Sequence, residues 1–350
     1  MPESIEQLIR DWDGLAVVTR YHEPTGAWIF IALHDATLGS PCGGTRLKHY
    51  AELADGLRDA MRLARGMTYK WATLKFKQGG GKAVLAVPGA LDDMARRELL
   101  LDYGRLIESL RGAFSTGRDL GTTDDDMRVL SEVTSYVHGV DENKETRDPG
   151  PYTARGVVAA MRATLGVAFG SDSFTGSSVL VQGLGGVGAP LARRLAKEGA
   201  VLLLSDIDEE RVAELAGELG ATSVPAGDVY ETKCDVYAPC ALGETLNAET
   251  IPRLRCRAVV GSANSQLGED DDADRLHERG ILYAPDFIAN GGGALAFALI
   301  NSGMTDEGKL GLRLDAIADT VSQVLTRAIT ENRSPHHVAV DRVAAILKAG

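Results

Sequence analysis

Residues 179–188 read VLVQGLGGVG, and this stretch decides the fold. The apolar run at 179–183 predicts a strand, and the helical period over 187–199 predicts a helix directly after it. Three glycines lie at the junction with G-x-G-x-x-G spacing, and the next apolar run ends in Asp206. Glycines at this spacing between a strand and a helix, with an acidic residue after the next strand, are typical of a dinucleotide-binding β-α-β unit.

Each residue of this motif has a physical role. Gly183 allows the tight turn, Gly185 leaves room for a pyrophosphate, and Gly188 lets the helix pack closely on the strand. Asp206 is expected to accept hydrogen bonds from the adenosine ribose, and its charge would repel a 2′-phosphate. The motif therefore favours NAD over NADP. The alternative is a glycine-rich turn with a surface aspartate and no ligand.

Length and composition exclude several other classes of protein. The chain has 350 residues, which favours two domains, with 44% hydrophobic and 25% charged residues. The charge balance is 37 − 49 = −12, which argues against nucleic acid or an anionic membrane as a partner. Four cysteines form no C-x-x-C pair, so we expect no zinc site and no metal. A polar, acidic N-terminus and reduced thiols favour a cytoplasmic protein.

Apolar periodicity divides the chain near 140–151, a polar stretch that contains Pro and Gly. Before it, the pattern predicts strands at 27–36 and 83–87 and helices at 51–67, 91–112 and 124–138. After it, short apolar runs alternate with helical stretches, which predicts β-α-β units and a parallel sheet. The later strands are expected at 201–206, 235–239, 258–263 and 281–285, and the helices at 153–169, 187–199, 208–219, 292–303 and 310–330.

Candidate catalytic residues gather in the first part of the chain. Lys82 follows three glycines, which we expect to leave the backbone open to a substrate, and it precedes an apolar strand. Desolvation there would lower the pKa of Lys82 and let it act as a base. Lys70 ends a helical segment, and Asp119 lies in a Gly- and Thr-rich stretch before a helix. Taken singly, such residues are usually solvated lysines and a helix-capping aspartate.

Eight motifs, in order along the chain, resemble the amino-acid dehydrogenases. The similarity is greatest to the leucine, phenylalanine and valine dehydrogenases and more distant to glutamate dehydrogenase. The motifs are GGTRL (43–47), ARGMTYK (64–70), GGGKAV (79–84), TGRDLGTTDDDM (116–127), GLGGVG (183–188), APCALG (238–243), GSANSQL (261–267) and APDFIANGGG (284–293).

The resemblance implies an α/β protein of two domains with the active site in the cleft between them. The N-terminal α/β domain, 1–145, would bind the substrate and carry the oligomer interface, and the helix at about 325–350 would return to it. Residues 150–325 would form a doubly wound NAD-binding domain of the Rossmann type. The implied enzyme is a homo-oligomer that oxidises an L-amino acid with NAD and water to a 2-oxo acid, ammonia and NADH.

Site residues follow from the same resemblance. Lys70 would bind the substrate carboxylate, Lys82 as the neutral amine would activate water, and Asp119 would handle protons at the substrate nitrogen. Gly43, Gly44 and Asn264 would also lie near the substrate. The expected cofactor contacts are Gly183, Gly185, Gly186, Val187, Gly188, Asp206, Ile207, Thr153, Ala238, Pro239, Cys240 and Asn290.

Substrate choice depends on the side-chain pocket, whose positions by resemblance are Cys42, Gly117, Ala294 and Phe297. The small Gly117 and Ala294 leave room for a phenylalanine-like or broadly hydrophobic side chain, and a branched-chain substrate is the alternative. The chain departs from the family at 291–293, where an added glycine is expected to loosen a helix start.

A second departure is Arg118, which either lowers the pKa of Asp119 or points to solvent. Two other readings of the chain stay open: a dehydrogenase of imines or hydroxy acids on the same plan, and a catalytically silent NAD-binding protein. The presence of Lys70, Lys82 and Asp119 together argues against both.

Overall fold

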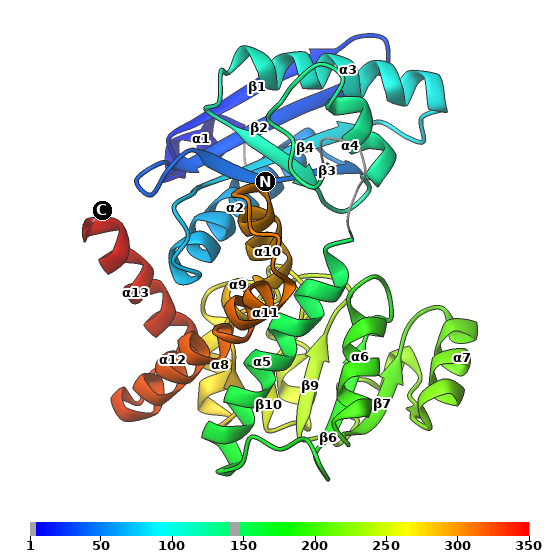
Figure 1. Cartoon of the computed structure of the whole chain (residues 1–350), viewed down its shortest axis with the longest axis vertical. Coiled ribbons are helices and arrows are strands. Elements are labelled where there is room, and N and C mark those ends of the chain that lie inside the picture. Colours follow the sequence, from blue (N-terminus) through cyan, green and yellow to red (C-terminus); the bar gives the residue numbers. More distant parts are fainter. Residues whose placement is uncertain (1–4, 141–147, 350) are drawn as a thin grey trace. The chain divides into compact units, whose positions relative to one another are not determined.

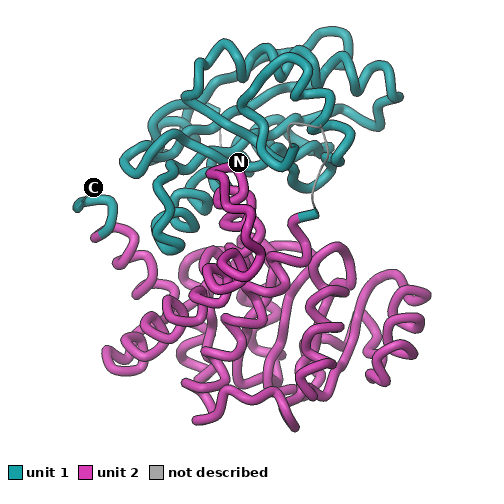
Figure 2. The backbone as a smooth tube through the Cα atoms, in the orientation of Figure 1, with its two compact units in different colours: residues 1–148, 346–350 teal, residues 149–345 magenta. Residues whose placement is uncertain are grey.

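A computed structural model describes residues 5–140 and 148–349. The chain divides into two compact units, shown in Figure 2. Unit 1 comprises residues 1–148 and 346–350, and unit 2 comprises residues 149–345. The division falls within the polar stretch at 140–151, of which residues 141–147 lie outside the described ranges. Unit 2 extends past residue 325, and only the last five residues of the chain are grouped with unit 1.

Unit 1 is built, over its described residues, on a five-stranded mixed sheet in the order β1-β2-β4-β3-β5. Its strands are β1 (Ala16–His22), β2 (Ala27–Asp35), β3 (Pro41–His49), β4 (Gly79–Val87) and β5 (Ser115–Arg118). β2 runs antiparallel to β1 and β4, whereas β3 runs parallel to β4 and β5. β4 is therefore the central strand, and every residue in it is buried.

Helices cover both faces of this sheet because its strands are apolar on both sides. Phe30 and Val84 pack with the apolar side chains of α2 (Leu53–Thr73), and Ile31 and Leu85 pack with those of α3 (Asp93–Ser109). Successive side chains of a strand point to opposite faces, so alternate residues reach the two cores. α4 (Asp124–Leu130) joins the α3 side, and α1 (Ile5–Asp11) contacts α2.

Unit 2 is built, over its described residues, on a six-stranded parallel sheet in the order β11-β10-β9-β6-β7-β8 (Figure 1). The chain leaves the central strand β6 toward β8 and then returns to β9 on its other side. This is the doubly wound order of a Rossmann domain, with the switch point between β6 and β9. The predicted α/β class with a parallel nucleotide-binding sheet is confirmed.

The strands of unit 2 are β6 (Ser178–Gln182), β7 (Val201–Ser205), β8 (Thr222–Ser223), β9 (Val236–Pro239), β10 (Ala258–Val259) and β11 (Leu282–Tyr283). Its helices are α5 (Gly150–Phe169), α6 (Gly188–Lys197), α7 (Glu209–Leu219), α8 (Asp272–Glu278), α9 (Asp286–Ala289), α10 (Gly292–Asn301), α11 (Glu307–Asp315), α12 (Ile317–Glu331) and α13 (Pro335–Ala349). α5 contacts α6, α10, α11 and α12.

The observed elements differ from the expected ones in instructive places. The glycine run belongs to β4, so Lys82 lies inside the strand and not before it. The expected helix at 124–138 ends at Leu130, and the one at 310–330 is two helices, α11 and α12. β1, β3 and β5 were not predicted, because β3 and β5 carry Gly, Thr and charged residues in place of an apolar run. Over the described ranges, each helix is too short or too polar to span a membrane.

Candidate active site

Lys82 and Asp119 form a buried ion pair in unit 1. Nζ of Lys82 lies 2.9 Å from Oδ2 of Asp119, and their side chains are 5% and 16% exposed. Lys82 extends from β4 toward the α2 face, since it stands opposite Ala32 and alternates with Val84, both of which pack with α2. Asp119 follows β5 directly. A base and a carboxylate distant in sequence therefore meet on the α2 face of the sheet.

Asp119 is positioned by a hydrogen bond of its backbone N–H as well as by the ion pair of its side chain. Its N–H donates to Oγ1 of Thr122, and that hydroxyl donates to the Thr45 carbonyl, 2.9 Å in each case. The cap of α4 is Thr123, whose side chain forms a capping box with Asp126. Asp119 is thus not the helix cap that its position before a helix suggested.

Arg46 forms a second ion pair with the Asp119 carboxylate, and the sequence analysis did not predict this contact. Its Nε lies 3.1 Å from Oδ2 of Asp119, and its Nη1 lies 2.8 Å from Oδ2 of Asp59 on α2. The signal that could have found it is the spacing in GGTRL, which puts Arg46 two residues after Gly44 on the same face of a strand. Burial raises the pKa of the Asp119 carboxyl, but the charges of Lys82 and Arg46 outweigh burial and lower it to about 2.

Lys70 is buried on the last turn of α2, the helix that packs along β4. Arg118, by contrast, pairs with Asp124 at 3.0 Å and is 39% exposed. Of the two readings left open for Arg118, its carboxylate partner is therefore Asp124, and the arginine beside Asp119 is Arg46.

Glycines in unit 1 serve close packing. A Cβ at Gly44 would come within 2.9 Å of Cβ of Asp119, so this glycine lets the aspartate approach β3. A Cβ at Gly43 would meet the Gly81 carbonyl oxygen at 1.8 Å, and one at Gly80 would meet Oγ1 of Thr68 on α2 at 1.9 Å. The glycine run is therefore required by strand and helix packing, and the expectation that it leaves backbone open to a substrate is wrong for these buried residues.

Cys42 and Gly117, the pocket positions expected in unit 1, share a neighbour that was not predicted. The thiol of Cys42 is hydrogen-bonded to the imidazole of His138. Burial raises the pKa of this thiol, but the imidazole and hydrogen bonds with Ser115 and Gln78 together outweigh burial and lower it below its usual value. Nε2 of His138 also lies 2.8 Å from Oγ of Ser115, and a Cβ at Gly117 would lie 3.7 Å from Cβ of His138.

The nucleotide turn of unit 2 has the geometry that its glycines predict. Gly183 has a φ of +92°, and a Cβ on Gly188 would lie 1.8 Å from the Gly183 carbonyl oxygen, so both positions require glycine. Gly185 and Gly186 have no heavy atom within 4 Å of an added Cβ. The turn, with Val187 as the residue before α6, thus has open space at the point where a pyrophosphate would lie, and the residues fit a dinucleotide.

Asp206, the residue after β7, stabilises this turn by accepting backbone hydrogen bonds. Its Oδ2 accepts from the Leu184 N–H at 2.6 Å and its Oδ1 from the Asp208 N–H at 3.0 Å. Burial raises the pKa of this carboxyl, and the backbone donors outweigh burial and lower it. Arg211 of α7 lies 3.9 Å from Asp206 and pairs with Asp208, so one cation lies near the Asp206 carboxylate. Ile207 is 92% exposed.

Asn264 and Asn290 lie together in unit 2. Nδ2 of Asn290 donates to Oδ1 of Asn264 at 2.9 Å, and Oδ1 of Asn290 is buried without a hydrogen-bond partner among the residues that the structure describes. Asp286 accepts from the Ser265 N–H and so holds the loop that carries Asn264. An orphaned buried acceptor beside the carboxyl ends of the strands is a place where a ligand amide can donate.

The other expected cofactor and pocket residues lie on neighbouring elements of unit 2. Thr153 is in the first turn of α5, Ala238 and Pro239 end β9, Cys240 follows them, and Ala294 and Phe297 are on α10. Gly292 and Gly293 are the first two residues of α10. A Cβ at Gly292 would lie 2.4 Å from the Tyr152 carbonyl oxygen, and one at Gly293 2.5 Å from Oγ1 of Thr153. They let α10 pack closely on α5.

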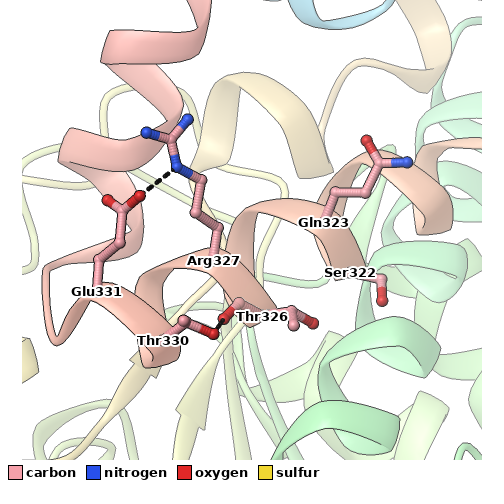
Figure 3. Close-up of a pocket in the computed structure, with 6 residues that line it drawn as sticks. All are labelled: Ser322, Gln323, Thr326, Arg327, Thr330 and Glu331. Atoms are coloured by element: carbon pink, nitrogen blue, oxygen red, sulfur yellow. Dashed lines mark hydrogen bonds and ion pairs between the residues drawn. The ribbon is translucent and has the colours of Figure 1, made fainter.

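A hollow of about 450 Å³ lies elsewhere, along the exposed side of α12 (Figure 3). It is lined by Ser322, Gln323, Thr326, Arg327, Thr330 and Glu331, with Arg327 paired to Glu331. None of the expected site residues lines this hollow. Because all of its lining residues lie on one helix, it is a shallow surface feature and cannot enclose a ligand. Within residues 5–140 and 148–349, no group of three His, Cys, Asp or Glu is placed to hold a metal ion.

Comparison with known proteins agrees with these features. Residues 22–136 match the family model described as Glu/Leu/Phe/Val dehydrogenase, dimerisation domain, and residues 201–339 match Glutamate/Leucine/Phenylalanine/Valine dehydrogenase. Leucine dehydrogenase of Geobacillus stearothermophilus is 41% identical over 91% of this chain and 86% of its own length. Phenylalanine dehydrogenase of Lysinibacillus sphaericus is 42% identical over 78% of this chain and 73% of its own length.

A solved structure is similar over the full length. The crystal structure of L-tryptophan dehydrogenase from Nostoc punctiforme has a TM-score of 0.81 and 34% identity, and the match covers 99% of both chains. Both units are thus matched by the family models, and the relatives cover most of the chain. The resemblance seen in the eight motifs is confirmed: this chain belongs to the Glu/Leu/Phe/Val family of nicotinamide-dependent amino-acid dehydrogenases.

Proposed function

We propose that this chain catalyses the reversible, NAD-dependent oxidative deamination of a hydrophobic L-amino acid. The products are the 2-oxo acid, ammonia and NADH. The observation that carries the proposal is the buried ion pair of Lys82 and Asp119, 2.9 Å apart, on the face of the unit 1 sheet where α2 carries Lys70. A base, a carboxylate and a second cation on one face are the groups that this reaction needs.

Each of the three residues has a defined task in the proposal. Lys70 binds the substrate carboxylate, which fixes the α-carbon. Asp119 accepts a proton from the substrate ammonium, because only a neutral amine can donate its lone pair as the α-hydrogen leaves. NAD, when bound, accepts that hydrogen as hydride. Lys82, as the neutral amine, takes a proton from the water that adds to the iminium carbon, and ammonia then leaves.

The preference for NAD rests on the turn after β6. Gly185 and Gly186 leave open space for the pyrophosphate, and Asp206 offers its carboxylate at the end of β7. Arg211 is already paired with Asp208, so the net charge beside the ribose favours a free 2′-hydroxyl over a 2′-phosphate.

Small residues at the expected pocket positions support a large apolar side chain. Among the described residues, a Cβ at Gly117 would contact only His138 within 4 Å, at ordinary van der Waals distance. The relatives described above act on leucine, phenylalanine and tryptophan by their names. We therefore propose a phenylalanine-like or broadly hydrophobic substrate, with a branched-chain amino acid as the alternative.

We also propose that the protein is a homo-oligomer whose interface is on unit 1. Residues 22–136 match a family model described as a dimerisation domain, and they lie within that unit. Size-exclusion chromatography with light scattering checks this proposal directly, since a monomer of the purified chain would contradict it.

One assay tests the reaction. Purified protein is mixed with NAD and a panel of L-amino acids at alkaline pH, and NADH absorbance is followed. We expect the highest kcat/KM with aromatic or large aliphatic substrates. Activity only with 2-hydroxy acids or imines would replace the proposal with another dehydrogenase. NAD binding without turnover of any substrate would favour a catalytically silent homologue.

A further inference from the structure

Arg46 and Lys82 share a single oxygen of Asp119. Both donate to Oδ2, at 3.1 and 2.9 Å, and the Arg46 side chain is only 13% exposed. Within the described part of the chain, no group donates a hydrogen bond to Oδ1 of Asp119. The carboxylate therefore has one oxygen held by two cations and one oxygen left for a further donor.

Two cations thus share the single negative charge of Asp119 at Oδ2. Like charges at close range disfavour the state in which both are protonated. The guanidinium of Arg46 does not lose its proton in proteins, whereas the amine of Lys82 can. Arg46 therefore remains a charged partner of Asp119 whether or not Lys82 carries its proton.

Asp59 braces Arg46 from helix α2. Its Oδ2 lies 2.8 Å from Nη1 of Arg46 and 2.6 Å from the Tyr50 hydroxyl, and its Oδ1 lies 3.2 Å from Nη2 of Arg62. The Asp59 side chain is 10% exposed. The guanidinium is therefore fixed between two buried carboxylates, one on the helix and one at the site.

The charges near Lys82 can be assigned to their elements. β3 contributes Arg46, the segment after β5 contributes Asp119, and β2 places uncharged Ala32 opposite Lys82. α2 carries Asp59, Arg62 and Lys70.

We infer that Arg46, braced by Asp59, is a positioning residue of the reaction. It orients Asp119 through Oδ2 so that Oδ1 faces the substrate amino group, and it keeps a fixed positive charge on that carboxylate. This inference rests on the proposed function, because it assigns Arg46 a part in the deamination step. It predicts a change in the pH dependence of turnover that a purely structural arginine would not cause.

The test is the pH profile of kcat/KM for the wild-type chain, Arg46→Gln, Arg46→Lys and Asp59→Asn, all with NAD and the best amino acid. Every variant meets the same substrate, so ionisation of the substrate is common to all profiles. In Arg46→Gln we expect the acidic limb to move to higher pH by about one unit, because Asp119 then loses one of the two cations that lower its pKa. Arg46→Lys should return the acidic limb toward the wild-type position, because the positive charge is restored. Its kcat should stay low, because an ammonium group lacks the planar set of donors with which the guanidinium reaches both carboxylates.

Asp59→Asn should move the acidic limb of the pH profile in the opposite direction. When Asp59 is neutral, the charge of Arg46 is no longer shared between two carboxylates and acts on Asp119 alone. The acidic limb of the pH profile should therefore move to lower pH. If Arg46→Gln does not fold, this variant decides the question alone, and an unchanged limb overturns the inference. Arg20→Gln is the matched control, because it removes another arginine–aspartate pair of unit 1, with Asp102 at 3.2 Å, and should leave the limb in place.

The two levels of proposal fail in different ways. A wild-type chain that turns over no amino acid contradicts the proposed function, and the inference with it. An active wild-type chain whose limb stays within a few tenths of a pH unit in Arg46→Gln contradicts the inference alone.

Discussion

Nζ of Lys82 lies 2.9 Å from Oδ2 of Asp119, and this ion pair joins the central strand β4 to the segment after β5. Both side chains are largely buried, so each carries its charge where water screens it little. In the proposed reaction both must exchange protons with substrate or water.

Replacement of Lys82 should abolish turnover without removing the cofactor site. We expect Lys82→Ala to lower kcat by about 10²–10⁴-fold, the usual contribution of a general base. NAD affinity, measured by fluorescence titration, should stay within about twofold because the nucleotide turn belongs to unit 2. Lys77→Ala, at an exposed position near the same glycine run, is the control. Retained turnover in Lys82→Ala would remove its assignment as the base.

Glycines of the nucleotide turn should separate into two classes. Gly188→Ala places a Cβ 1.8 Å from the Gly183 carbonyl oxygen, so we expect loss of thermal stability. Gly185→Ala meets no atom within 4 Å and should fold normally while NAD binding weakens. Thermal melts and NAD titrations of both variants distinguish the two effects. Equal stability of the two would contradict the packing role of Gly188.

A side chain at position 117 should narrow the substrate range. Gly117→Ala brings its Cβ into ordinary contact with His138, at 3.5 and 3.7 Å, so the fold should tolerate it. We expect the ratio of kcat/KM for phenylalanine to that for leucine to fall about tenfold. Gly89→Ala, which has open space, is the control. An unchanged ratio would place the side-chain pocket elsewhere.

Neutralising Asp206 should weaken the preference for NAD. In Asp206→Asn the repulsion of a 2′-phosphate disappears, and Arg211, 3.9 Å from that carboxylate, stays in place. We expect the ratio of kcat/KM with NAD to that with NADP to fall at least tenfold, and part of the fall to come from weaker NAD binding. A ratio equal to that of the wild type would assign cofactor choice to another residue.

Acid should destabilise unit 1 through Asp126. Burial raises the pKa of this carboxyl, but its hydrogen bonds to Arg96 outweigh burial and lower it. A depressed native pKa means stability that is present above the unfolded value of about 3.9 and is lost as pH falls toward the native value. Melting temperatures at pH 5 and below should therefore fall less steeply in Asp126→Asn than in the wild type. Parallel curves would show that other groups control acid unfolding.

Local signals were enough to predict the nucleotide-binding half. Apart from the short, polar β8 (Thr222–Ser223), its described strands lie in apolar runs, and its turn requires glycine at Gly183 and Gly188 for reasons of backbone geometry that act over six residues. In unit 1 the strands β3 and β5 were not predicted, because residues such as Gly44, Arg46 and Gly117 give no apolar period. Their strand conformation depends on partners that are remote in sequence, since β3 pairs with β4 and β5 pairs with β3.

The sequence by itself determined the family, the parallel sheet of unit 2 and the identity of Lys70, Lys82 and Asp119 as candidates, because motifs and apolar periods are local in the chain. The tertiary structure alone decided that Arg46 and not Arg118 contacts Asp119, that His138 contacts Cys42, and that the glycine run packs against α2. Such contacts follow from strand register and from the face of the sheet that each side chain occupies. Neither is encoded in any short stretch of residues.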